Sequence, residues 1–367
     1  MTGGGGGSTS CGAGPEIPLA KERPHSPERP GEYPRELVLR VNEVFHDVER
    51  DGYDTKHART LRDEAGRWQG LAAELLGGER AAVSVLDVGS GTGFVPLQLG
   101  PRLREGDRLV CSDLSAGMLE TCEKNLRDAG LACRIEFVKS SGGGRGGGSG
   151  GGKPAGLDLS AESFDLVTMN SVLHHIPEPG EFLAGLGRLV RPGGAGGAIV
   201  ICHEPNRDFY ASRLTRWNHR LCFYLFQPKE AVVKVLRALR IYGPARRLYR
   251  WALGRTDAAD PILDEVNRRL IEAGAIREPL DPDELTAITD IHSPISGGWH
   301  PERGIDIRRL VREYMPGYEI ERFETSNHLG ELVPRFFLSR WYEAVVARLA
   351  PSRGATFMAV LRGPSVP

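Results

Sequence analysis

The run from Val83 to Gly93 constrains this chain most, because a short apolar segment, a carboxylate and three glycines follow one another without interruption. Residues Val83 to Val88 are rich in β-branched side chains, which is typical of a parallel strand buried on both faces. The glycines that follow allow positive φ angles and leave no Cβ between the backbone and a ligand. The segment therefore predicts a strand, a tight turn and a helix that together bind a nucleotide-type cofactor.

The spacing of the glycines distinguishes two cofactor classes. Dinucleotide sites favour G-x-G-x-x-G, whereas this chain reads D-x-G-x-G-x-G from Asp87 onward. That form resembles the first motif of the class I S-adenosylmethionine (SAM)-dependent methyltransferases, in which the loop passes beneath the methionine part of the cofactor. Other α/β proteins can share such a turn, so later segments must support the resemblance.

Later segments resemble further motifs of the same family, in the family's order. Residues 112–119 (S-D-L-S-A-G-M-L) resemble the second motif, after a strand predicted at 107–111. Residues 163–176 (S-F-D-L-V-T-M-N-S-V-L-H-H-I) resemble the fourth, and 189–194 (L-V-R-P-G-G) its usual sequel. Matches in this order over residues 80–204 indicate a SAM-binding domain.

The resemblance implies which residues surround SAM. Asp113 stands where the family binds both ribose hydroxyls, although it can also serve as the cap of the next helix. Leu114 and Met118 resemble the apolar residues beside the adenine. The implied set of cofactor-binding residues is Asp87, Gly89, Gly91, Gly93, Asp113, Leu114, Met118, Asn170 and His174.

The chain departs from the family after a third predicted strand at 134–138. The family usually has a Gly-Asp pair there, whose carboxylate meets the adenine, but this chain continues with Lys139, Ser140 and Ser141. A glycine-rich tract follows at 142–152 and predicts a flexible surface loop. Either serine, or Asp158 beyond the tract, can take the place of the missing carboxylate.

The predicted fold is α/β, with a Rossmann-like, seven-stranded, mostly parallel sheet, an N-terminal helical cap and a large helical lid insertion. The last two strands are expected at 318–324 and 356–361, and the second helix of the cap at 61–76. The predicted organisation is a disordered N-terminal tail at 1–33, the cap at 34–78, the SAM-binding core at 79–205, the lid at 206–303 and the C-terminal completion of the sheet at 304–367.

The lid begins with an unusually basic and aromatic segment, residues 207–255. It contains twelve Lys or Arg residues against two acidic ones, together with nine aromatic residues. Such a segment can form an amphipathic lid over the substrate, contact a lipophilic or anionic substrate or a membrane surface, or bind RNA. A later helix, within 329–351, groups Phe336, Phe337, Leu338, Trp341 and Tyr342, which predicts a buried or pocket-facing surface.

Catalytic candidates follow from the cofactor. The methyl group of SAM is already activated, so the protein mainly positions the nucleophile and needs a base only where the nucleophile keeps a proton. Candidates at the expected strand ends and in the lid are His175, His203, Glu204, Asp290 and His292. His175 can instead cap the following helix. Asp290, His292 and His300 can ligate a divalent metal, but their spacing is loose and no metal is assigned.

Composition narrows the function class. The net charge of −1 does not indicate a nucleic-acid binder. The six cysteines form no C-x-x-C pair, and no apolar run approaches a membrane span, which favours a cytoplasmic protein. We therefore expect a SAM-dependent methyltransferase that acts at O, N or C of a small, hydrophobic or acidic molecule. A SAM enzyme of another reaction type and a non-catalytic SAM sensor are the alternatives, and the oligomeric state is open.

Overall fold

The computed structural model describes residues 33–142, 156–157, 159–192, 197–226, 260–294, 303–330, 333 and 336–364. The predicted N-terminal tail up to residue 32, nearly all of the glycine tract, Asp158, His300 and the basic segment after Phe226 lie outside the described residues.

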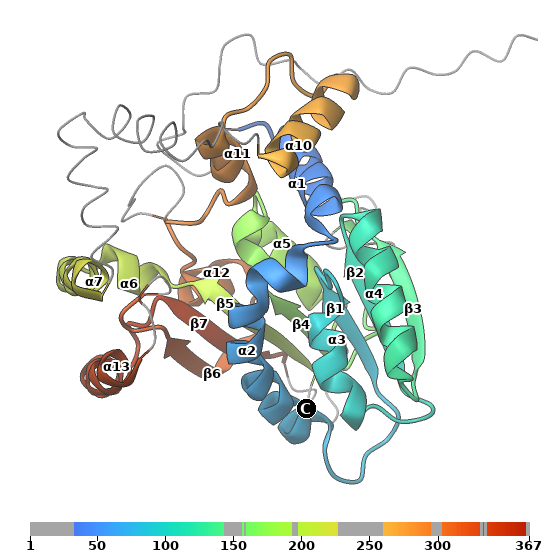
Figure 1. Cartoon of the computed structure of the whole chain (residues 1–367). Coiled ribbons are helices and arrows are strands. Elements are labelled where there is room, and N and C mark those ends of the chain that lie inside the picture. The colour runs from blue at the N-terminus through green and yellow to red at the C-terminus, as the bar shows by residue number, and fades with distance from the viewer. Residues whose placement is uncertain are drawn as a thin grey trace, which may run out of the picture.

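One seven-stranded sheet organises the fold, in the order β3-β2-β1-β4-β5-β7-β6 (Figure 1). The first five strands are parallel, and β7 runs antiparallel to both of its neighbours. This confirms the predicted α/β, mostly parallel sheet. The strands are β1 (Ser84–Val88), β2 (Arg108–Asp113), β3 (Arg134–Lys139), β4 (Leu166–Asn170), β5 (Ala198–Pro205), β6 (Glu319–Ser326) and β7 (Thr356–Arg362).

Both faces of the sheet are buried because successive strand residues point to opposite sides. In β1, Leu86 packs on the face covered by α5 (Pro179–Gly187) and α12 (Ile307–Tyr314). Its neighbour Val85 packs on the opposite face, together with Trp68. That face is covered by α2 (Tyr53–Leu76), α3 (Phe94–Leu99) and α4 (Ala116–Ala129), with the short η1 (Gly100–Arg102) after α3. The two core layers explain the continuous apolar runs in the strands.

The two N-terminal helices pack in different places. The second helix, α2, begins at Tyr53, earlier than predicted, and its C-terminal half joins the core of the sheet. The first, α1 (Arg35–Glu49), instead packs with α10 (Pro261–Glu272) and α11 (Pro282–Thr289) in a separate apolar cluster. Among the described residues, no helix is long and apolar enough to cross a membrane.

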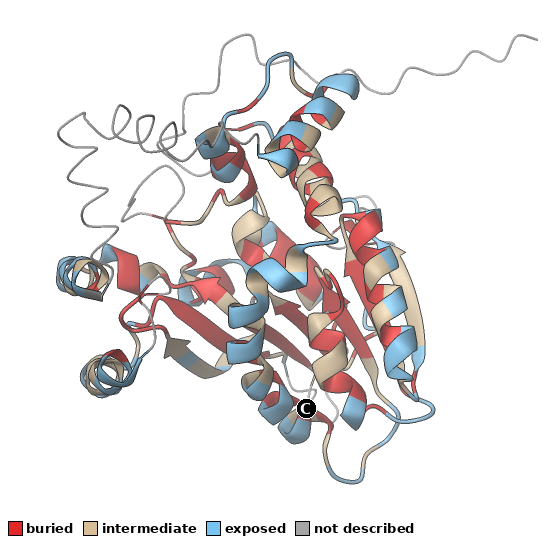
Figure 2. Cartoon of the chain, viewed as in Figure 1, coloured by how far each residue is buried: buried red, intermediate tan, exposed pale blue. Residues whose placement is uncertain are grey.

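The C-terminal helix corrects one prediction. Helix α13 (Phe337–Leu349) lies beside α7 (Arg213–Phe226), which follows the short α6 (Arg207–Ala211). The sequence predicted that its aromatic residues would be buried or face a pocket, but Phe337, Leu338 and Trp341 are exposed. Figure 2 colours much of α13 as exposed. Tyr342, a member of the predicted cluster, lies with Val346 on the packed side of α13, so the prediction holds for Tyr342 and fails for the other members.

Asp107 lies at the amino-terminal ends of the central strands, at the end of the sheet away from the cofactor turn. Its carboxylate is 2% exposed and accepts two hydrogen bonds from Arg80 and one each from the backbone N–H groups of Val83 and Arg104. These donors lower the pKa of Asp107 to about 2, although burial alone would raise it. The carboxylate therefore ties the chain before β1 to the chain before β2.

We expect Asp107→Asn to lower the free energy of unfolding at pH 7 by about 2 kcal/mol, the value of the pKa difference. Because the folded-state pKa is depressed, this contribution is complete above the unfolded pKa near 4 and is lost as the pH falls toward 2. Urea unfolding from pH 7 to pH 2.5 measures it. Glu123→Gln, in the exposed pair with Arg127, is the control and should change stability by a few tenths of a kcal/mol. A pH-independent effect of Asp107→Asn would contradict the assignment.

Candidate active site

The glycine turn lies at the carboxyl end of β1 and forms one wall of a cavity. Gly89, Gly91 and Gly93 all have positive φ, at 65°, 52° and 94°. A Cβ on Gly89 would lie 2.4 Å from the side chain of Val172, whereas a Cβ on Gly91 would meet nothing within 4 Å. Gly89 is therefore required by packing, and Gly91 leaves open space for a ligand beside the backbone.

Asp113 fixes the turn against the end of β2. One carboxylate oxygen accepts the N–H of Gly91 at 2.9 Å, and the other accepts the N–H of Ser115 at 2.9 Å. Burial raises the pKa of Asp113, while these backbone donors and nearby His46 act in the opposite direction. Each oxygen keeps a further lone pair, so the carboxylate can support the turn and still accept hydrogen bonds from a ligand.

The cavity beside this turn fits SAM in its chemistry. Apolar Val88, Leu114 and Met118 line it together with polar Ser112 and Asp113. Within the part of the chain that the structure describes, the buried hydroxyl of Ser112 has no hydrogen-bond partner, so it is available to a polar ligand group. These residues would hold the nucleoside part of the cofactor, and Asn170 also lines the cavity.

The serines after β3 differ in position. Ser140 lines the cofactor cavity, whereas the hydroxyl of Ser141 donates to the carbonyl of Gly156 at 2.9 Å. Of the two, Ser140 is therefore the one placed to meet the adenine. Asp158, the other alternative, lies outside the described residues.

Asp87, predicted to contact the cofactor, is not among the residues that line the cofactor cavity. It is buried beneath the glycine turn and accepts a hydrogen bond from the hydroxyl of Thr168 at 2.7 Å. Burial raises its pKa to about 7. Asp87 therefore supports the turn from the sheet.

A second cavity, of about 610 Å³, adjoins the first at the carboxyl ends of β4 and β5. Residues of the sheet ends, α2 and the α1–α10–α11 cluster line it, and five of its polar residues are histidines. The residues that line both cavities are His46, Tyr53, Asn170, Ser171 and His175. A reactant in the second cavity would thus lie next to a cofactor in the first.

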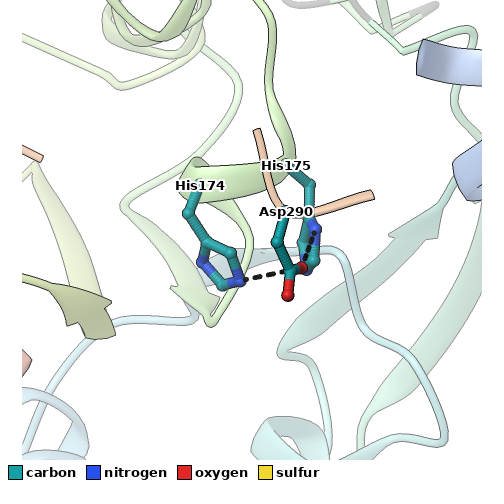
Figure 3. A group of neighbouring side chains, drawn as sticks. All are labelled: His174, His175 and Asp290. Atoms are coloured by element: carbon teal, nitrogen blue, oxygen red, sulfur yellow. Dashed lines mark ion pairs between the residues drawn. The ribbon is translucent and has the colours of Figure 1, made fainter. Parts of the chain in front are cut away.

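His175 is held by its Nδ1 atom, on the 3-10 helix η3 (Leu173–His175). This nitrogen lies 2.7 Å from the carbonyl oxygen of Thr289 and 3.2 Å from the carboxylate of Asp290 (Figure 3). A carbonyl oxygen only accepts hydrogen bonds, so Nδ1 carries the proton and Nε2 keeps a lone pair. Burial and the neighbouring histidines hold the pKa of His175 well below its usual value. The ring is therefore neutral near pH 7 and can accept a proton.

Glu204, predicted as a catalytic residue, contacts His174 and the backbone of the loop after β4. Its carboxylate is 0% exposed and accepts the N–H groups of Val172, Leu173 and His174. It also lies 2.8 Å from Nδ1 of His174. Glu204 is therefore a positioning residue, and His174, expected at the cofactor, lines the second cavity instead.

His203 lines the second cavity on a distorted part of β5. Its φ angle is 57°, and the pairing of β5 with β7 shifts register at this point. Its Nδ1 lies 3.4 Å from Glu64 of α2, whose carboxylate also pairs with Arg67. Glu64 was not predicted, and its only signal in the sequence is an acidic residue on the apolar side of a helix.

His292, predicted as a catalytic residue, is held by contacts with the loop after β4. It does not line either cavity, and its Nε2 lies 2.9 Å from the carbonyl oxygen of Ile176. Burial lowers its pKa to about 4. Its backbone N–H donates to the carbonyl of His174, so this residue joins the lid to the loop after β4.

The ring atoms of His174 and His175 and the carboxylate of Asp290 lie within 4.8 Å of one another, a separation at which a metal could be held. The three side chains converge in Figure 3. However, a metal at Nδ1 of His175 would have to displace the proton donated to Thr289. The hydrogen bonds fit a proton-accepting group better than a metal centre.

Comparisons with known proteins agree with this geometry. A family model described as a methyltransferase domain matches residues 86–196. The ubiquinone/menaquinone biosynthesis C-methyltransferase UbiE of Vibrio vulnificus (strain YJ016) is 24% identical over 159 residues, 43% of this chain and 56% of that protein. UbiE of Hahella chejuensis is 29% identical over 117 residues, 32% of this chain and 42% of that protein. The chain spans about half the length of these curated relatives.

Among solved structures, a SAM-dependent methyltransferase from Aquifex aeolicus is 22% identical, with a TM-score of 0.31 over 38% of this chain and 64% of that one. The [4+2]-cyclase SpnF is 13% identical, with a TM-score of 0.40 over 82% of each chain. Residues 86–196 therefore match a methyltransferase domain, and the glycine turn and the sheet order fit the SAM-dependent methyltransferase fold that the sequence resembles.

We expect Asp113→Ala to weaken SAM binding roughly 10- to 150-fold, because hydrogen bonds to a charged group contribute about 1.5–3 kcal/mol. Gly91→Val should weaken it further by filling the space beside the turn and by straining a residue with positive φ. Titration calorimetry with SAM measures both. Asp128→Ala, at an exposed position of α4, is the control. Unchanged affinity in the folded variants would show that SAM does not bind beside this turn.

Proposed function

We propose that this protein transfers the methyl group of SAM to an acceptor that must lose a proton, held in the 610 Å³ cavity. One observation carries the proposal: His175 lines both cavities and is neutral, with Nδ1 engaged and Nε2 free to accept a proton. A base in this place would serve an acceptor O–H more than an amine, because an amine is already nucleophilic once neutral.

Bound SAM supplies an activated methyl group. The protein's own contribution is then to orient the acceptor and to remove its proton. Nε2 of His175 takes the proton from the acceptor O–H. The Thr289 carbonyl and the Asp290 carboxylate both face Nδ1, so they hold the ring in place and stabilise the positive charge that it gains.

The lining of the cavity favours a hydroxylated aromatic acceptor. Phe45, Tyr53 and Tyr210 supply aromatic surface, and His174 and His203 supply groups that can bind hydroxyls. The relatives named as ubiquinone/menaquinone C-methyltransferases support an acceptor ring of this type. Loss of the phenolic proton makes both the oxygen and the ring carbon beside it nucleophilic, so we propose methylation at O or at that carbon.

His175→Asn tests the base. The Asn amide can replace Nδ1 as a donor to Thr289 but has no group at Nε2, so we expect kcat to fall about 10²- to 10⁴-fold with little change in SAM affinity. Release of S-adenosylhomocysteine with a panel of phenols and short-chain quinols measures turnover. His292→Asn is the matched control, because His292 lines neither cavity. Equal losses in both variants would indicate a structural effect. Stoichiometric SAM binding without turnover on any acceptor would instead support a SAM sensor.

The pH profile gives a second test. Only neutral His175 can accept a proton, and its pKa lies well below 6.5 because of burial. We therefore expect kcat/KM of the wild type to stay high as the pH falls through 6.5 and to decline only in more acidic solution. The residual activity of His175→Asn should not show this decline in acidic solution. A wild-type limb centred at 6.5 or higher would contradict the assignment of His175 as a buried base.

A further inference from the structure

Exposed apolar side chains gather on two neighbouring helices. The described chain has eleven large hydrophobic residues that are exposed, and nine of them belong to α7, α13 or the residue that precedes α13. Trp217, Trp341 and Phe337 are 63%, 60% and 88% exposed. The other members are Leu214, Leu221, Leu225, Phe336, Leu338 and Leu349. A concentration of this kind marks an interaction surface.

Each helix presents these residues as one stripe. At about 100° per residue, Leu214, Trp217, Leu221 and Leu225 fall within about 80° of each other around α7. The exposed residues of α13 fall within about 120° around Trp341. Next to one border of each stripe, Cys222 of α7 and Tyr342 of α13 belong to a shared apolar cluster. The exposed stripes are therefore not the surfaces by which the helices pack on the protein.

The two stripes face the same way. Ser212, before α7, accepts a hydrogen bond from Arg353, beyond the end of α13. Further along α7, Asn218 accepts one from Tyr342, near the middle of α13. These contacts show that the helices run antiparallel. Seen from its own N-terminus, each helix has its stripe on the same rotational side of its contact with the other helix. Antiparallel packing of the neighbouring helices α7 and α13 (Figure 1) therefore places both stripes on one side of the pair. We call this surface the α7–α13 face.

The charge of the α7–α13 face is positive. Exposed arginines lie on both helices: Arg213 and Arg220 on α7, Arg340 and Arg348 on α13. Helix α7 contains no acidic residue. The single carboxylate of α13, Glu343, is half-buried and accepts the backbone N–H of His328. On α7 the arginines lie on the side of the stripe that is away from α13, so the apolar residues are bordered by positive charge.

We propose that the α7–α13 face docks on an anionic lipid membrane, with its Trp, Leu and Phe side chains at the boundary between headgroups and acyl chains. Apolar and tryptophan residues bordered by arginine are what an anionic lipid surface binds. A second copy of the chain fits less well, because a two-fold contact would bring the exposed arginines of both copies together without an exposed carboxylate on either helix. The proposal stands on this surface and does not depend on the methyl-transfer reaction.

The surface is connected to the active site. Helix α6 precedes α7 directly, and its Tyr210 lines the second cavity. Arg216 of α7 donates to the carbonyl of Tyr210 at 2.7 Å. Docking would thus bring one wall of that cavity near the lipid surface, where a lipid-soluble acceptor is concentrated.

The test is sedimentation of the full chain with vesicles, without SAM. We expect the wild type to bind vesicles of phosphatidylcholine with phosphatidylglycerol, and to bind pure phosphatidylcholine much more weakly. Binding should also fall at 1 M salt, where the screening length drops to about 3 Å. Blue-shifted tryptophan emission in anionic vesicles, reduced in Trp217→Phe with Trp341→Phe, would show that these side chains enter the lipid. Absence of wild-type binding to anionic vesicles would overturn the proposal.

Variants separate the face from the rest of the surface. Trp217→Ser with Trp341→Ser should reduce partitioning at least about 10-fold, and Arg213→Gln, Arg220→Gln and Arg348→Gln about five-fold each. Ile271→Ser and Arg277→Gln, exposed elsewhere, should have no effect. Equal losses in these controls would overturn the proposal. So would a dimer that sediments in the absence of lipid and dissociates in Trp217→Ser with Trp341→Ser, because a second copy would then cover the face.

Discussion

The active site depends on one buried carboxylate. Glu204 at the end of β5 collects three successive backbone N–H groups, from Val172 to His174, and the Nδ1 atom of His174. A buried charge would be strongly unfavourable without such partners. The four hydrogen bonds define the course of the chain after β4, and with it the position of His175. They also explain why strained positive-φ residues are tolerated at Ser171 and His203 on the two adjoining strand ends.

The helical cluster above the sheet depends on a second carboxylate. Asp47 of α1 accepts the N–H of Gly117 at the start of α4, and it pairs with Arg269 of α10. The Asp47 oxygen that accepts the Gly117 N–H also accepts a hydrogen bond from the hydroxyl of Ser115. The N–H of Ser115 in turn donates to Asp113. The helix that covers the second cavity is therefore linked, through two residues, to the carboxylate at the cofactor turn. Cofactor binding and the position of α1 should be coupled by this chain of hydrogen bonds.

Sequence patterns predicted the sheet well, because buried parallel strands are continuous apolar runs and the glycine turn has few other uses. They predicted which histidines and acids cluster near the strand ends, but not which way each side chain faces. Glu204 and His203 are neighbours in the sequence, and a register shift in β5 sends one into the interior and the other into the cavity. Glu64 and Asp47 could not be found, since their partners lie far away in the chain.

The exposed aromatic residues of α13 show most clearly what the amino-acid composition of a helix does not predict. A cluster of Phe, Leu and Trp predicts burial in a core, yet periodicity alone does not say which side of a helix the protein occupies. The tertiary contacts of Tyr342 and Val346 decide it. Those contacts come from α7, more than a hundred residues earlier in the chain, and from Leu329 and Val333. Once the pair is formed, the remaining apolar stripes have no protein partner among the described residues. The same packing that stabilises the pair therefore leaves a tryptophan-rich, basic surface exposed beside the wall of the second cavity.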